Sequence, residues 1–246
     1  MSKKKGYKYL LKIVFSAMLL AGTTGCDVYK DFVKSQLDEI PDSYFKNINR
    51  YIKLTTDGKP VLADVENPIG IVIQNACEED KKKIISTIEQ MNDFCPNLDF
   101  TLTDKNNIHI ENKINIYTDY DTKLLDDREL AGLCISSYDS DTAKIVYPVN
   151  IYIDSRVKDY KNGYGDNIFT QVLKHELMHS LGFLDMSSDA YQNKTIMYEG
   201  VQKYIDDFTK LDIYNIKQLY DEKTVVAERP KKLDVFPYKK EEELEM

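Results

Sequence analysis

The sequence contains no Cys-x-x-Cys pair, the spacing typical of cysteine-bound zinc and of redox-active disulfides. Its four cysteines stand singly. If Cys26 is lipidated, Cys77, Cys95 and Cys134 remain, and an odd number allows at most one disulfide and leaves a free thiol. Cys77 and Cys95 flank a predicted helix, so they could pair only if the chain folds back. A zinc site built from cysteines is therefore a poor interpretation.

The chain also lacks tandem repeats and any linker rich in proline, glycine or serine. Its 246 residues therefore predict one medium-sized domain with short extensions. Hydrophobic residues make up 42% and charged residues 30%, which allows a sizeable core and argues against global disorder. We expect a tether with a peripheral helix at residues 26–59, a domain at 60–223 and a charged tail at 224–246.

Positive charge is scarce outside the N-terminus. Residues 1–25 contain five lysines and no acid, so removing them from the 33 basic residues leaves 28 against 41 acidic residues, a net charge of -13. Such a surface repels phosphate backbones. We therefore expect no nucleic acid partner. The expected partners are a peptide or protein substrate and, through Cys26, a membrane, and we expect a monomer.

The N-terminus begins with the lysine-rich segment MSKKKGYKYLLK, followed by the apolar stretch IVFSAMLLAG. This stretch is too short to span a bilayer, so residues 1–25 predict a signal peptide. Thr23-Thr24-Gly25-Cys26 resembles a bacterial lipobox, in which the cysteine is lipidated, although Thr23 stands where leucine is usual. The alternative is an ordinary signal peptide and a chance cysteine. We expect an exported lipoprotein, periplasmic or on the cell surface, or a secreted protein if the lipobox is not used.

Hydrophobic periodicity predicts an α+β fold in which a twisted sheet is backed by helices. The last strand contains Pro148, which cannot donate a ladder hydrogen bond and therefore predicts a bulge or a break. Asp166 or Asn167 can cap the helix that follows, and Gly182 can end it. Strands are predicted at residues 68–76, 97–103, 113–119, 131–139 and 143–154, and helices at 78–94, 166–182 and 206–223.

The segment HELMHSLGFLD (175–185) contains two of the chain's three histidines. On a helix, His175 and His179 lie on one face and can direct imidazole nitrogens to one metal ion. Glu176 can lean over the same ion and take a proton from a metal-bound water. Gly182 can adopt the left-handed conformation that stops the helix and returns Asp185 to the ion. The segment therefore predicts a catalytic zinc site with three protein ligands, His175, His179 and Asp185.

This segment matches H-E-x-x-H-x-x-G-x-x-H/D and resembles the signature of the metzincin zinc endopeptidases, in the aspartate form of the snapalysin-type branch. The segment KTIMYEG (194–200) resembles the methionine turn of that family, in its matrix metalloproteinase version. Residues 68–94 look like the opening strand and backing helix of a metzincin domain, and 208–221 like its closing helix. The resemblance implies a mostly parallel sheet of about five strands with an antiparallel edge strand.

The resemblance also implies roles for residues. His175, His179 and Asp185 would bind zinc, Glu176 would be the general base and Met197 would form a hydrophobic floor. An edge strand at 132–138 would pair with an extended peptide substrate. The implied substrate-binding residues are Gly132, Leu133, Cys134, Ile135, Val172 and Tyr198, with a further pocket wall at 200–204. The implied function is an exported zinc metalloendopeptidase.

Other interpretations remain open. Glu199 lies 20 residues beyond His179 and is a rival ligand, although Gly200 argues against the helix that usually carries such a glutamate. His109 could be a distant ligand, but a lone histidine in a strand is more often structural. Met197 could simply fill the core.

The acidic stretches at 119–127 and 138–141 could hold calcium, but they lack EF-hand spacing, and solvated loops explain them better. Two rival functions also remain. One is a non-catalytic zinc-binding or surface-structural lipoprotein that retains the fold. The other is a zinc hydrolase with a non-peptide substrate.

Overall fold

The computed structural model describes residues within 52–220, all of them in the unit that spans Ser43–Met246. The predicted signal peptide, Cys26, the pocket wall at 200–204 and the tail at 224–246 lie outside the described residues. Within the described part, no helix is long and apolar enough to cross a membrane. The described residues are 52–120, 130–162, 166–186, 194–199, 205 and 207–220.

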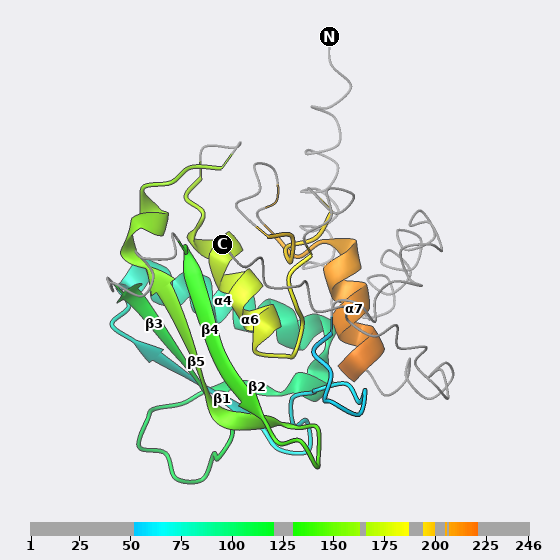
Figure 1. Ribbon diagram of the computed structural model, residues 1–246. Coiled ribbons are helices and arrows are strands. Elements are labelled where there is room, and N and C mark those ends of the chain that lie inside the picture. The colour runs from blue at the N-terminus through cyan, green and yellow to red at the C-terminus, as the bar shows by residue number, and fades with distance from the viewer. Residues whose placement is uncertain are drawn as a thin grey trace, which may run out of the picture. The chain divides into compact units, whose positions relative to one another are not determined.

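A five-stranded sheet forms the frame of this unit (Figure 1). Its strand order is β2-β1-β3-β5-β4, and β1 is parallel to both β2 and β3. Strands β3 and β5 are also parallel, whereas β4 is antiparallel to β5. The predicted α+β fold with a mostly parallel sheet and an antiparallel edge strand is thereby confirmed. The strands are β1 (Ile69–Gln74), β2 (Phe100–Leu102), β3 (Lys113–Tyr120), β4 (Gly132–Tyr138) and β5 (Ile145–Asp154).

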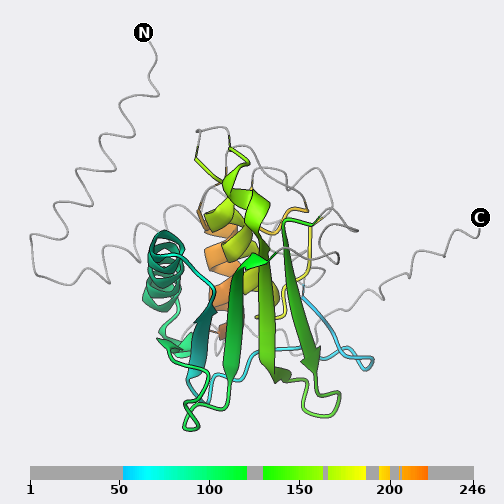
Figure 2. The ribbon, with the colours of Figure 1, turned by 90° about the vertical axis from the view of Figure 1, so that its left-hand side faces the viewer.

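Two helices back one face of the sheet (Figure 2). Helix α4 contacts β2 and α6, while α6 contacts β4 and β5. Helix α6 therefore packs against the edge of the sheet that β4 forms. The helices are α4 (Glu78–Phe94), α6 (Phe169–His179) and α7 (Lys210–Tyr220), with short 3-10 turns η2 (Pro96–Leu98) and η3 (Ser155–Lys158).

The core lies between the sheet and these helices. Alternate residues of β3 and β5 are buried because side chains of a strand point to opposite faces in turn. Residues of α4 and α6 at helical spacing fill the other side of the core. Buried side chains include Ile114, Ile116, Val149, Ile151 and Ile153 from the strands and Ile84, Ile88, Met91, Leu173 and Leu177 from the helices.

The sequence predicted either a bulge or a break at Pro148. The structure has a bulge there, and the strand is not broken. Strand β5 runs through Pro148, yet its register with β4 shifts there. Ile135 pairs with Asn150 and Ser137 pairs with Val146, so two steps along β4 correspond to four along β5. A residue without a backbone N–H is tolerated at such an irregularity.

The two C-terminal helices begin later than predicted, α6 at Phe169 and α7 at Lys210. Helix α6 begins after Ile168, whose side chain makes no cap, so the predicted cap by Asp166 or Asn167 is wrong. The Asp166 backbone N–H instead donates to Asn162 Oδ1 at 3.0 Å and shapes the approach to the helix. Gly182 has the predicted left-handed conformation, with φ +92°. Cys77, Cys95 and Cys134 form no disulfide among the described residues.

Candidate metal centre and cleft

Helix α6 and the loop after it bring together the three predicted ligands. His175 and His179 lie one turn apart, and their Nε2 atoms approach to 3.0 Å. Asp185 Oδ1 lies 3.0 Å from Nε2 of His175 and 3.4 Å from Nε2 of His179. Within the described residues, this is the single group of three or more His, Cys, Asp or Glu side chains that could hold a metal ion.

The outer nitrogens of both rings are fixed by backbone carbonyls. His175 Nδ1 lies 2.8 Å from the Ile196 carbonyl oxygen, and His179 Nδ1 lies 2.8 Å from that of Phe183. A carbonyl oxygen only accepts, so Nδ1 of each ring must carry the hydrogen. A neutral ring then presents the lone pair of Nε2, which is the arrangement of a histidine prepared to bind a metal.

The donor spacing fits a small tetrahedral ion. Coordination at about 2.0–2.1 Å separates two ligands by roughly 3.3 Å. The three observed separations of 3.0, 3.0 and 3.4 Å lie close to that value. Two lone pairs facing each other at 3.0 Å repel unless a cation lies between them. The three side chains can therefore hold one divalent metal.

Without a metal, a proton takes the place of the cation. Burial lowers the pKa of His175, but its hydrogen bond to Asp185 and the charge of Glu176 outweigh this and raise the pKa to about 9. Burial alone would raise the pKa of Asp185, but its hydrogen bonds to both histidines hold it well below its usual range. Protons and metal therefore compete for the same nitrogens.

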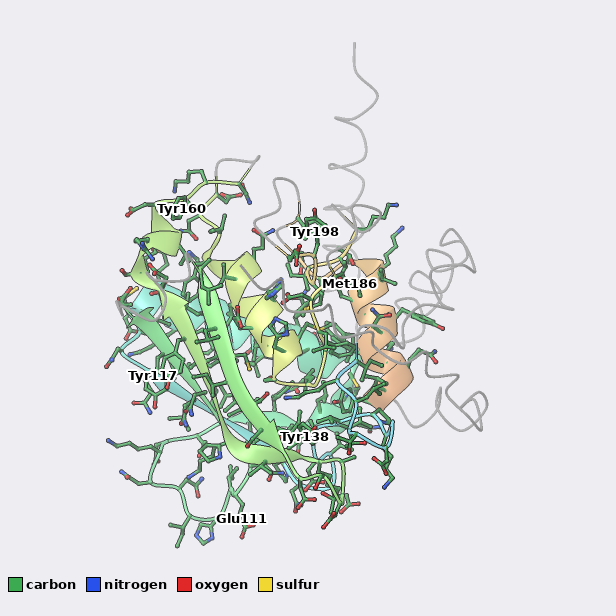
Figure 3. All side chains as sticks on the ribbon, in the orientation of Figure 1. Glu111, Tyr117, Tyr138, Tyr160, Met186 and Tyr198 are labelled. Carbon is green, nitrogen blue, oxygen red and sulfur yellow. The ribbon has the colours of Figure 1, made fainter. Side chains whose placement is uncertain are left out.

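The turn that supports His175 is anchored by a buried carboxylate. Asp212 of α7 is fully buried and accepts hydrogen bonds from Thr195 Oγ1 and, at 3.0 Å, from the Ile196 backbone N–H. The Ile196 carbonyl in turn accepts from His175. Met197, the predicted floor, follows directly and is fully buried. Figure 3 places Met186 and Tyr198, which pair across this turn, beside α7.

The loop that supports His179 is braced by an N-terminal strap, residues 52–63. The Lys53 backbone N–H donates to the Gly182 carbonyl at 2.8 Å, and the Val61 N–H donates to the Lys53 carbonyl at 2.8 Å. A Cβ on Gly182 would lie 2.2 Å from the Val61 carbonyl oxygen. Residues 52–59, assigned to the tether from the sequence, are thus hydrogen-bonded to the metal-site loop.

Glu176 points from α6 toward β4 and is 6% exposed. Burial raises the pKa of its carboxyl, and the charges of His175 and His179 partly oppose the rise. Gly132 leaves the space that this carboxylate occupies. A Cβ on Gly132 would lie 2.7 Å from Glu176 Oε1 and 2.6 Å from Val172 Cγ1, so no side chain fits there without displacement.

A cavity of about 620 Å³ opens between α6 and β4 and contains the three ligands and Glu176. Four of the predicted substrate-binding residues line it: Gly132, Leu133, Cys134 and Val172.

The other two predicted substrate-binding residues do not line this cavity. Ile135 is 46% exposed and, as the next residue along the strand, points to the opposite face of the sheet. Tyr198 pairs with Met186 instead.

The rival ligands fall outside the cluster. Glu199 lines the cavity but does not join the three donors. His109 is exposed in the loop between β2 and β3, close in sequence to Glu111, which Figure 3 places at the far end of the sheet. Residues to which the sequence assigned no metal-binding or substrate-binding role also line the cavity: Lys53, Leu130, Ala131, Gln171, Phe183, Leu184 and Ile196.

Strand β4 forms the free edge of the sheet along this cavity. It pairs with β5 on one side only in the observed strand order. An edge strand of this kind presents unpaired backbone N–H and C=O groups. The cavity therefore combines a metal-binding cluster, a buried carboxylate and a strand edge.

Comparison with protein families finds no model that matches the chain, and comparison with curated proteins finds no match either. The case for function therefore depends on the chemistry of this site.

Proposed function

We propose that the protein is a zinc-dependent endopeptidase with a metzincin-type domain. The observation that carries the proposal is the convergence of His175 Nε2, His179 Nε2 and Asp185 Oδ1 within 3.4 Å of one another, with the carboxylate of Glu176 in the same cavity. Three protein donors leave one position of a tetrahedral ion open, which is the arrangement of catalytic rather than structural zinc.

The donor set favours zinc over harder cations. Two imidazoles and one carboxylate suit zinc, whereas calcium and magnesium prefer oxygen ligands alone. Zinc bound there would polarise the scissile carbonyl and lower the pKa of a water molecule. The fixed hydrogens on Nδ1 of both histidines keep the rings in the orientation that this binding needs.

Glu176 is the proton carrier in this proposal. Its carboxylate takes a proton from the attacking water and passes it to the leaving amide nitrogen. Burial, which raises its pKa, makes the carboxylate a stronger base than an exposed glutamate. Gly132 leaves the space that this carboxylate occupies between β4 and α6.

The edge of β4 is the proposed substrate-binding element. An extended peptide can add to this edge as a further strand, with its carbonyl groups directed along the cavity. Such binding uses backbone hydrogen bonds and therefore tolerates many sequences. A peptide bond is thus a better candidate substrate than a small ester or amide, which could not use the strand edge.

We also propose that the protein is exported and anchored through lipid on Cys26, on the basis of the lysine-rich leader and the Gly25-Cys26 pair. Labelling cells with radioactive palmitate tests this. The protein should incorporate label, and Cys26→Ser should not. Equal labelling of both would contradict the anchor.

The activity is tested with protein that begins at residue 27. Metal analysis should find about one zinc per chain, and the protein should cleave an unfolded substrate such as casein. Glu176→Gln should keep the zinc and lose about 10²-fold or more in rate, the range of general acid–base catalysis. Zinc bound without cleavage of casein or of a broad peptide library would favour a non-catalytic role, and full activity of Glu176→Gln would exclude the proposed mechanism.

A further inference from the structure

Lys53 brings a positive charge to the cavity from a distant part of the sequence. Its backbone is fixed on both sides, by Gly182 and by Val61. Its Nζ lies 5.0 Å from the ring centroid of Tyr138, at the last residue of β4. Figure 3 labels Tyr138 at that end of the strand. Lys53 therefore lines the cavity at the Tyr138 end of β4.

The other charged side chains that line the cavity are, besides the histidines, the carboxylates of Glu176, Asp185 and Glu199. Lys53 pairs with none of them, and no ion pair joins it to any carboxylate in the part of the chain that the structure describes. Several other lysines do pair, including Lys144 with Asp64 and Lys174 with Asp207.

The positive charge of Lys53 acts on Cys134 in β4. Burial and the charge of Glu176 raise the pKa of the Cys134 thiol, and Lys53 partly offsets that rise. Cys134 and Glu176 line the same cavity as Lys53. The lysine is therefore close to the part of the strand edge where the proposed reaction takes place.

We propose that Lys53 binds a carboxylate of the peptide substrate and so makes the enzyme prefer acidic peptides. This inference rests on the proposed peptidase function and adds a substrate class to it. From Cys134 to Tyr138 is four residues, or roughly 13 Å at about 3.3 Å per residue. The preferred acid therefore lies within about four residues of the cleaved bond, on one side of it.

The test uses ten-residue peptides of alanine with one central leucine, each carrying a single glutamate or glutamine at successive positions. Each peptide is made with a free and with an amidated C-terminus. At one position the wild type should cleave the glutamate peptide about three- to fivefold better in kcat/KM, the range of a partly exposed ion pair. A preference that needs the free C-terminus would assign the bound carboxylate to the chain end instead of a side chain.

Two substitutions identify Lys53 as the cause. Lys53→Ala should abolish the preference, and Lys53→Glu should invert it in favour of a lysine peptide. Lys82→Glu makes the same change of charge at an exposed position of α4, outside the cavity, and should leave the preference intact. An acid preference that survives in Lys53→Glu, or that is absent from the wild type at every position, would overturn the inference.

A measurement of peptide affinity tests the role of Lys53 independently of whether the protein cleaves peptides. Fluorescence polarisation measures the affinity of the same peptides, labelled with fluorescein, for zinc-loaded Glu176→Gln protein. A threefold or greater preference for glutamate that disappears with Lys53→Ala would support the lysine site even if no peptide were cleaved. Equal affinities for glutamate and glutamine peptides would reject it, whatever the wild type cleaves.

Discussion

The two candidate zinc histidines are held in place in different ways. His179, the last residue of α6, binds the carbonyl of Phe183, four residues further along the chain. His175 binds the carbonyl of Ile196, 21 residues away, and the Ile196 N–H is held by Asp212 on another helix. One support is local and the other is tertiary. Loss of the contacts between Ile196 and Asp212 should therefore destabilise more of the fold than loss of the hydrogen bond from His179 to Phe183.

Asp212→Ala should have the largest effect on stability. It removes a fully buried acceptor and leaves the hydroxyl of Thr195 and the backbone N–H groups of Ile196 and Thr209 without their partner. Each buried unsatisfied group costs about 1–3 kcal/mol, so the free energy of unfolding should fall by about 3 kcal/mol or more. Urea denaturation monitored by circular dichroism measures this, and zinc affinity should fall with it.

Asp207→Ala is the control for Asp212→Ala. Asp207 lies five residues earlier, is itself exposed, and pairs with the buried side chain of Lys174 on α6. Its removal should leave zinc affinity unchanged. If both variants lost zinc equally, the link from Asp212 through Ile196 to His175 would be wrong.

Gly132→Ala should reduce activity more than stability, because the added Cβ lies 2.7 Å from Glu176 Oε1 and not against a ligand. We expect kcat to fall about 10²-fold, the lower range of general acid–base catalysis, with normal zinc content. Steady-state kinetics and metal analysis measure the two quantities. Adding Val172→Ala, which removes the 2.6 Å contact, should restore part of kcat, whereas a loss of zinc in the single variant would contradict this account.

Gly182→Ala tests the local support. Alanine at φ +92° is strained, and its Cβ would lie 2.2 Å from the Val61 carbonyl oxygen. The strain alone costs about 1–2 kcal/mol, and the strap must also move. Thermal unfolding should show a lower Tm. Zinc affinity should fall because Phe183, the support of His179, follows directly, and unchanged affinity would show that the strap does not brace the loop.

The smallest expected effect is a change in the pH dependence of stability on metal removal. The pKa of His175 is raised from 6.5 to about 9 in the metal-free protein, so the stabilisation by its protonated form is fully present below pH 6.5 and lost as the pH rises through about 9. With zinc present, the sign should reverse, because a higher pH removes the protons that compete with the metal and so strengthens zinc binding to the folded protein. Melting curves from pH 6 to 9, with EDTA or with zinc, measure both slopes, and equal slopes would contradict the competition.

Much of the fold followed from the sequence because its signals are local. Strand alternation and helical periodicity located the eight predicted elements, and Gly182 marked the turn after α6. The predicted cap by Asp166 or Asn167 was wrong because Asn162 holds the Asp166 backbone N–H and the helix starts later. The side chain of Ile135 lies outside the cavity because a strand sends alternate side chains to opposite faces.

The spacing of HELMHSLGFLD predicted that His175, His179 and Asp185 lie together, because the helical repeat and a glycine turn act over eleven consecutive residues. The tertiary structure alone decided which groups surround that cluster. Lys53 and Asp212 lie far from it in the chain, and neither belongs to a local pattern that marks its role. Their positions depend on strand order and helix packing, which join segments that no short-range periodicity connects.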